Sequence, residues 1–280
     1  MIQFTHESGE AVIVAATNGF GVYLDNDSLV ELAKGSASRR KRFVDSLQGK
    51  GTLLFSWANA VEVAGPQGRS ADAVRSFLDS IGPHWVPLEL SPWEVVRREE
   101  AGLTAETVVS KTFMEAFFKD RSHDLSEGSA ADPFFRLGVV VDWVQEHRDE
   151  IRTRADQIDD EFRKLLEALR ANFEKDATSM DRLLPPCQFD GRYPATFVLR
   201  HLQRLLISEA KAYQFKSHDG LDLCHATLAA AYGSLITLDS QWKRRVRALP
   251  ESEKLARTYY RPEIDKLVAM MEALASRRDA

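Results

Sequence analysis

Four acidic residues of this sequence stand where a parallel sheet would bring them together. Asp25 follows the apolar segment VYL, Glu62 lies in the helical segment after LLFS, and Asp239 follows LIT. Asp222 begins the helix that leads into the last of these strands. Carboxylates held close together repel one another, and a hard divalent cation with oxygen ligands relieves that repulsion. Such ions activate water and stabilise the leaving oxygen of a phosphodiester, so the pattern predicts a metal-dependent hydrolytic site.

The elements that must position these acids alternate between strand and helix. Strands are predicted at 21–24, 52–56 and 85–88, separated by helical stretches, and the pattern resumes with a helix at 221–232 and a strand at 234–237. The run 11–16 is an edge strand or a hairpin partner. This alternation predicts an α/β fold with a parallel sheet, whose strand carboxyl ends line one crevice.

Between the two α/β parts the periodicity is helical. We therefore divide the chain into residues 1–90, a helical insertion at 91–215, and residues 216–280, which end in a helical tail at 252–278. The longest predicted helix runs from about Pro133 to Lys175. It carries an apolar stripe at three- and four-residue steps, formed by Ile151, Ala155, Ile158, Phe162, Leu165, Leu169 and Phe173. We favour a helical hairpin that packs within the chain over a coiled coil that would make a homodimer.

Bulk properties set the class of protein. With 280 residues and 44% apolar composition the chain can bury a full core. It has no apolar run of about 18 residues, no signal-peptide pattern and only two cysteines, which favours a cytoplasmic protein with no membrane partner. A net charge of -5 argues against a general nucleic-acid coating protein but is compatible with an acidic metal pocket.

Three segments carry a family resemblance. VYLDNDSLVELAKG, LLFSWANAVEVAG and DLCHATLAAAYGSLITLDSQW resemble, in order, the signature blocks of the PIN-domain (PIN-like) ribonucleases. The resemblance covers roughly residues 20–90 and 216–250. It implies a three-layer α/β/α fold around a parallel sheet, interrupted here by the long helical insertion. By position, the four acids of this sequence match the four acids of that family: Asp25, Glu62, Asp222 and Asp239.

The resemblance also implies a function. Members of that family hold Mg2+ or Mn2+ with these acids and cleave RNA, often as the toxin of a toxin–antitoxin pair. Thr237 matches the family's hydroxyl residue two before the fourth acid. Asp27 departs from the family pattern, in which Asn is common two residues after the first acid. The insertion is longer than in compact toxins, which suggests a cap over the site or a docking surface for an antitoxin or another protein.

Each candidate also has a purely structural interpretation. Asp25, Asp27 and Asp222 stand where a helix cap is common, and Asp239 stands where a turn is common. Glu62 lies between Val61 and Val63 in a segment otherwise without charge, which sets it apart from a solvated helix face. Asp219 competes with Asp222 for the metal role, and we favour Asp222.

Two basic runs are candidates for phosphate contacts. The first covers 39–42 and is equally well explained as a solvated helix face. The second, Lys243, Arg244 and Arg245 with Arg247 nearby, directly follows Asp239 and Trp242 and is the better candidate for nucleic-acid binding. Trp242 suits a core position better than base stacking.

Two alternatives stay open. The segment LDNDSL is similar to the first motif of haloacid-dehalogenase-like phosphatases, with Asp25 as nucleophile, Asp27 as general acid and Ser56 as a phosphate contact. That interpretation leaves Glu62 and Asp222 without a role. The other alternative is a non-catalytic PIN-like module that binds RNA or docks a protein. Zinc-hydrolase, nucleophile-elbow and P-loop motifs are absent from the sequence.

Overall fold

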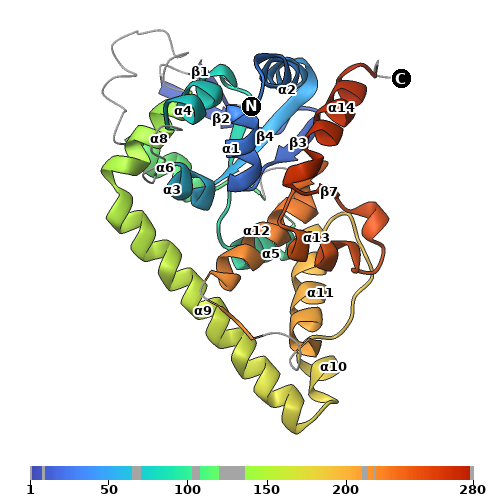
Figure 1. Cartoon of the computed structure of the whole chain (residues 1–280). Coiled ribbons are helices and arrows are strands. Elements are labelled where there is room, and N and C mark those ends of the chain that lie inside the picture. The colour runs from blue at the N-terminus through green and yellow to red at the C-terminus, as the bar shows by residue number, and fades with distance from the viewer. Residues whose placement is uncertain are drawn as a thin grey trace.

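The computed structural model describes residues 2–7, 10–64, 71–102, 108–119, 136–209, 214–216 and 218–277. At its centre lies a five-stranded parallel sheet in the order β5-β4-β3-β6-β7 (Figure 1). These strands are β3 (Phe20–Tyr23), β4 (Gly51–Ser56), β5 (Trp85–Leu88), β6 (Leu235–Thr237) and β7 (Arg257–Tyr259). The chain first builds the sheet outward from β3 and then returns to the other side of β3. The strand order therefore reverses between β3 and β6, and this is the point where open α/β sheets bind ligands.

Helices cover both faces of the sheet, so the expected α/β architecture is confirmed. Successive strand residues point to opposite faces, and two separate apolar clusters result. One cluster contains Val22 and Leu53 and packs under α1 (Asn26–Lys34), α2 (Ala37–Lys50), α4 (Ala71–Ser80), α8 (Leu137–Glu146) and α14 (Ile264–Ala275). The other contains Tyr23 and Leu54 and packs under α5 (Pro92–Glu100), α11 (Pro194–Ser208), α12 (Asp219–Tyr232) and α13 (Ser240–Arg247).

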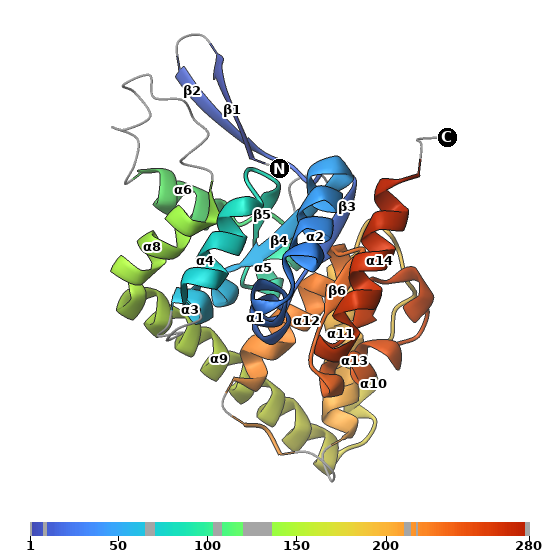
Figure 2. The same ribbon diagram turned by 45° about the horizontal axis from the view of Figure 1, so that its top comes forward.

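At the start and the end of the chain the structure refines two predictions, for the run 11–16 and for the helical tail 252–278. The run 11–16 is a hairpin partner: β1 (Ile2–Glu7) pairs antiparallel with β2 (Glu10–Ala15), and the hairpin stands out from the body (Figure 2). The prediction of a helical tail from 252 was wrong in its first part. Residues 257–259 form β7, which pairs in parallel with β6, and only 264–275 form a long helix.

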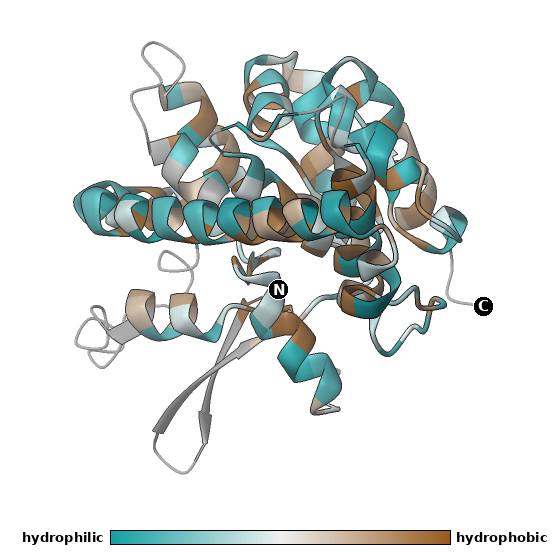
Figure 3. Cartoon of the chain, turned by 90° about the horizontal axis from the view of Figure 1, so that it is seen from below, coloured by the Kyte–Doolittle hydropathy of each residue, from teal (hydrophilic) through white to brown (hydrophobic). Residues whose placement is uncertain are grey.

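The helical insertion packs against the α/β body within the same chain. Among the described residues, its other helices are α6 (Lys111–Lys119), α9 (Arg148–Lys175) and α10 (Ser179–Leu183). The body also contributes α3 (Trp57–Ala64). Helix α9 contacts α12, α11 and α3, and its outward surface is mostly hydrophilic (Figure 3). The predicted helix from Pro133 is broken at His147, between α8 and α9, and residues 133–135 lie outside the described residues. No described helix is long and apolar enough to cross a membrane.

Candidate acidic active site

A cavity of about 200 Å³ lies at the carboxyl ends of β3 and β6, where the strand order reverses. It receives all four acids that the sequence singled out, together with Asp27. Its described lining contains no Lys or Arg and consists of Tyr23, Asp25, Asn26, Asp27, Asn59, Glu62, Asp222, His225, Leu238, Asp239 and Trp242. Segments separated by more than 150 positions in the sequence therefore form one concentrated acidic surface.

Asp25 is held by its own helix and by the neighbouring strand. It is the N-cap of α1, where its Oδ1 accepts a hydrogen bond from the Ser28 backbone N–H at 3.0 Å. The Thr237 hydroxyl donates to the same Oδ1 at 2.9 Å and accepts from the Asp25 N–H at 2.9 Å. Both of the bonds that the Asp25 carboxylate accepts use Oδ1, so Oδ2 takes no part in the cap. The structural and the chemical interpretations of Asp25 are thus compatible.

Glu62 is positioned by the way in which α3 starts. The Ser56 hydroxyl accepts from the Asn59 N–H at 3.1 Å, and Asn59 Oδ1 accepts from the Ser56 N–H at 3.1 Å, which is a reciprocal cap. The Asn59 amide also donates to the Leu24 carbonyl at 3.0 Å, so it fastens α3 to the end of β3. Glu62 follows Asn59 by three residues and so lies on the same helix face.

Asp222, rather than Asp219, lines the cavity. Asp219 is buried, and its carboxylate accepts a hydrogen bond from the Lys216 backbone N–H, next to the start of α12. Asp222 lies one turn further along α12 and receives a hydrogen bond from the Trp242 side chain. Trp242 is itself buried, as the sequence favoured, and it serves here as a donor to an acid. The geometry supports the choice of Asp222 over Asp219.

Asp239 and Asp27 complete the acidic lining. Asp239 is the N-cap of α13, and its Oδ1 accepts from the backbone N–H groups of Gln241 at 2.7 Å and Trp242 at 2.8 Å. Asp27 lies in the first turn of α1 and is exposed, with Arg261 3.9 Å from its Oδ2. Both carboxylates therefore lie at the solvent-facing side of the cavity.

Three acids of this cavity, Glu62, Asp222 and Asp25, resist ionisation. Burial, followed by repulsion from Asp222, Asp25 and Asp27, raises the pKa of Glu62 to about 7. Although the Glu62 residue as a whole is exposed, its carboxyl lies deep enough for burial to be the largest cause. Burial, with repulsion from Asp239, raises the pKa of Asp222 to about 6. Burial also raises the pKa of Asp25, against the lowering effect of its bonds with Ser28 and Thr237.

The donor set fits a hard divalent cation in its chemistry. Carboxylate oxygens are the ligands that Mg2+ and Mn2+ take, and a bound cation would lower the pKa values that burial and mutual repulsion raise. Within the described parts of the chain, no three His, Cys, Asp or Glu side chains are grouped so that they hold a metal ion as they stand. Binding would therefore have to draw the carboxylates closer together.

The lining residues that were not identified from the sequence include Tyr23, His225 and Asn59. Tyr23 is fully buried, and burial and nearby Glu62 raise its pKa well above the usual value, so it stays a neutral phenol. Its ring stacks on His225, with the ring centroids 5.9 Å apart, and burial lowers the pKa of His225 to about 4. For Asn59, the spacing of three from Glu62 was the available signal.

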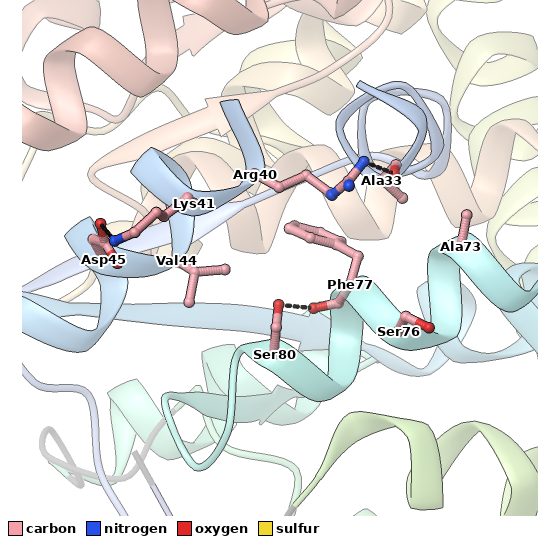
Figure 4. A pocket seen from close by; sticks show the side chains of 9 residues that line it. All are labelled: Ala33, Arg40, Lys41, Val44, Asp45, Ala73, Ser76, Phe77 and Ser80. Carbon is pink, nitrogen blue, oxygen red and sulfur yellow. Dashed lines mark hydrogen bonds and ion pairs between the residues drawn. The ribbon is translucent and has the colours of Figure 1, made fainter. Parts of the chain in front are cut away.

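The first basic run is occupied by contacts within the chain. Arg39 pairs with Glu31 and Asp265, and Arg42 pairs with Glu272. Arg40 and Lys41 line a second cavity of about 380 Å³ between α1, α2 and α4 (Figure 4). There Arg40 donates to the Ala33 and Gly35 carbonyls, at 3.0 and 2.6 Å, and Lys41 pairs with Asp45 at 2.6 Å. This run ties α2 to its neighbours, and the larger cavity lacks the acidic donor set.

For the second basic run, the structure corrects part of the prediction that Lys243, Arg244 and Arg245 contact phosphates. Arg245 is buried and pairs with Glu209 at 3.0 Å, and Lys243 pairs with Glu263 and lies over the Tyr260 ring. Neither side chain is placed to contact an external phosphate. Arg244 is exposed and stays available for that role.

The structure does not place Ser56 where the phosphatase interpretation needs it, in contact with a bound phosphate. Ser56 is fully buried, and its hydroxyl donates to Asn59 Oδ1 at 2.8 Å. It is not among the residues that line the acidic cavity. Glu62 and Asp222, which that interpretation leaves without a role, do line it.

Comparisons of the chain with models of protein families, with curated proteins and with solved structures gave no match.

Proposed function

We propose that this chain is a metal-dependent nuclease that hydrolyses RNA phosphodiesters at the acidic cavity. The observation that carries the proposal is the convergence of Asp25, Glu62, Asp222 and Asp239 on one cavity at the point where the strand order reverses. Four separate segments supply these acids, and burial together with repulsion raises the pKa of three of them. Perturbed carboxylates gathered in a cleft are typical of sites that bind cations and perform acid–base chemistry.

Asp25, Glu62, Asp222 and Asp239 would hold Mg2+ or Mn2+. When bound, the ion supplies a water of lowered pKa and stabilises the leaving oxygen of the phosphodiester. The protein contributes the arrangement of the donors. Thr237 fixes Asp25, and the Trp242 side chain fixes Asp222 through a hydrogen bond. The raised pKa values mean that cation binding releases protons from Glu62 near neutral pH, and from Asp222 at pH 6 and below.

RNA as the substrate follows from the resemblance of the three sequence segments to PIN-like ribonucleases. The exposed Arg244, five residues after Asp239, is the remaining candidate of the second basic run for a phosphate contact. The same resemblance extends the proposal to a toxin whose antitoxin, or another protein partner, docks on the helical insertion. Co-purification of a partner that suppresses cleavage would test that extension.

The main test is cleavage of a labelled single-stranded RNA by the full chain with Mn2+. Asp25→Asn should abolish cleavage, whereas Asp27→Asn should change the rate only modestly, because Asp27 is an exposed residue at the edge of the cavity. The pair is well matched, since both variants replace one carboxylate by an amide in the same loop-to-helix segment. Circular dichroism on both proteins checks that they fold.

The contrary outcomes are distinct. A wild type that hydrolyses a phosphomonoester but not RNA, and that loses this activity with Asp27→Asn, would favour the phosphatase. A wild type without either activity, and without Mn2+-dependent stabilisation, would favour a non-catalytic module.

A further inference from the structure

One buried acid of the insertion contacts the helix that carries Asp222. Asp159 lies on α9 and is 7% exposed. Its Oδ2 accepts from the His218 backbone N–H at 3.0 Å, and its Oδ1 accepts from those of Gly220 at 2.8 Å and Leu221 at 3.1 Å. The first N–H groups of a helix have no partner within the helix and attract negative charge. Asp159 therefore caps α12 from a different helix.

The start of α12 depends on this outside cap. The residue at its own N-cap position, His218, makes no side-chain capping bond and has a left-handed backbone with φ of 76°. A side chain at Gly220 would place its Cβ 2.6 Å from the Asp159 carbonyl oxygen and 2.9 Å from Asp159 Oδ1. The two helices thus approach each other at a point where only glycine fits. Asp222 follows directly, in the first turn of α12.

We propose that Asp159 is a positioning residue for the acidic cavity: it fixes the first turn of α12 and thereby sets the place of Asp222 among the other three acids. This inference rests on the proposed function. It gives the long insertion a specific role, because α9 supplies a group that the α/β body lacks at this helix end. Mutation of groups that orient metal ligands typically weakens metal affinity by roughly 10- to 100-fold.

The insertion also contains a matched control. Glu99 on α5 is a buried carboxylate, 1% exposed, that caps α11 in the same way. It accepts from the Ala195 N–H at 2.7 Å, the Thr196 N–H at 2.9 Å and the Thr196 hydroxyl at 2.6 Å. Its carboxylate further accepts from the Tyr232 hydroxyl at 2.6 Å. Helix α11 carries none of the four acids, and Tyr232 lies at the end of α12 opposite to Asp222, so loss of this cap should cost stability alone.

The experiment measures Mn2+ affinity of the full chain by titration calorimetry, with melting temperature and amide hydrogen exchange on the same samples. The variants are Asp159→Asn, Asp159→Ala, Gly220→Ala and the control Glu99→Gln. Asp159→Asn is the mild change, because it keeps an oxygen for Gly220 and Leu221. Gly220→Ala disturbs the same contact from the side of α12. Each Asp159 variant is also combined with Asp222→Asn.

We expect the Asp159 variants and Gly220→Ala to weaken Mn2+ binding by about 10-fold or more and to speed amide exchange at 218–222. Glu99→Gln should lower the melting temperature without changing Mn2+ affinity. Because Asp159 acts through Asp222, adding Asp159→Asn to Asp222→Asn should not weaken binding further. A purely structural role would give additive losses, and that result would overturn the proposal.

Two failures can be told apart. If the wild type binds Mn2+ and Asp159→Asn and Asp159→Ala leave the affinity unchanged, the positioning role of Asp159 is wrong and the proposed function stands. If the folded wild type binds no Mn2+, the proposed function fails and the role of Asp159 at the site fails with it.

Discussion

Thr237 and Asp25 exchange two hydrogen bonds across the junction of β3 and β6. The Thr237 hydroxyl accepts from the Asp25 N–H and donates to Asp25 Oδ1, both at 2.9 Å, and Thr237 is fully buried. The pair joins Asp25, the first of the four cavity acids along the chain, to β6, the strand that ends just before the fourth, Asp239. It fixes the Asp25 carboxylate at the place where the strand order reverses.

Replacing Thr237 by Val should therefore affect both stability and cation binding. The variant leaves the Asp25 N–H buried without its acceptor, which should lower the free energy of unfolding by about 1–3 kcal/mol. It also frees the Asp25 carboxylate, so we expect Mn2+ affinity to fall roughly 10-fold. Urea unfolding and calorimetric titration measure the two effects.

Thr227→Val is the matched control for this change. Thr227 is also fully buried, but among the described residues its hydroxyl has no hydrogen-bond partner. Its replacement should be neutral or stabilising. Equal losses of stability in both variants would mean that the bonds between Thr237 and Asp25 contribute nothing specific.

Cation binding should stabilise the fold in a way that depends on Asp222. At a free Mn2+ concentration about 100 times the dissociation constant, the wild type should gain about 2.7 kcal/mol, and a chelator should remove this gain. Asp222→Asn should lose most of it. Asp219→Asn should keep it, because the Asp219 carboxylate is bonded to the Lys216 N–H and does not line the cavity. If Asp219→Asn lost the stabilisation by Mn2+ and Asp222→Asn kept it, Asp219 would be the third acid of the site.

The stability of the metal-free protein should depend on pH through Glu62. Its pKa is about 7 in the folded chain, against an ordinary value of 4.5. Between these values the folded state binds more protons than the unfolded state, so stability falls as pH rises from 4.5 to about 7. Glu62→Gln removes this contribution and should be more stable than the wild type at pH 8, with little difference at pH 4.5.

The difference between the two proteins is the quantity to measure, by urea unfolding with a chelator present. His225 acts with the opposite sign, because burial lowers its pKa to about 4 and its contribution to stability is lost as pH falls below 6.5. Because the wild type and Glu62→Gln both contain His225, its effect cancels in the difference between their stabilities. A difference in stability that stays constant from pH 4.5 to pH 8 would show that the carboxyl of Glu62 is not perturbed.

The sheet and the convergence of the acids could be predicted from the sequence because both depend on short local patterns. Asp25 and Asp239 each come directly after a short apolar strand, and parallel strands place their carboxyl ends on one edge. The strand β7 was missed because it has only three residues and lies in a segment with apolar residues at helical spacing. Pairing with β6, rather than local preference, decides its conformation.

The support around the site was not predicted from the sequence, because its hydrogen bonds join distant segments of the chain. Asp159 lies 59 or more positions before the backbone groups that it caps. Within α9 it stands among several other acids that are exposed or form ion pairs on the surface. Its burial follows from the packing of α9 on α12. The one available signal was its spacing: Asp159 is four residues after Ala155 and three before Phe162, on the buried face of α9, whereas Asp156 and Asp160 lie off that face.

Arg245 and Arg244 provide the last test, because adjacent identical side chains have opposite environments. The Arg245 side chain is fully buried, pairs with Glu209 through two nitrogens at 3.0 and 3.2 Å, and lies over Trp242 at 4.8 Å. Arg245→Gln breaks a largely buried ion pair and should cost about 3 kcal/mol of unfolding free energy. Arg244→Gln changes an exposed side chain and should cost less than about 0.5 kcal/mol.

For RNA binding we expect the opposite order: the Arg244 variant should change it and the Arg245 variant should not. If Arg244 contacts one phosphate of a single strand, Arg244→Gln should reduce the slope of log affinity against log salt by about 0.7. Arg245→Gln should leave that slope unchanged at temperatures where the variant is folded. Binding of a labelled RNA without Mn2+, measured at four salt concentrations, gives the slopes. A slope that changes with Arg245 instead would mean that the buried guanidinium becomes exposed when RNA binds, and the assignment of the two arginines would have to be exchanged.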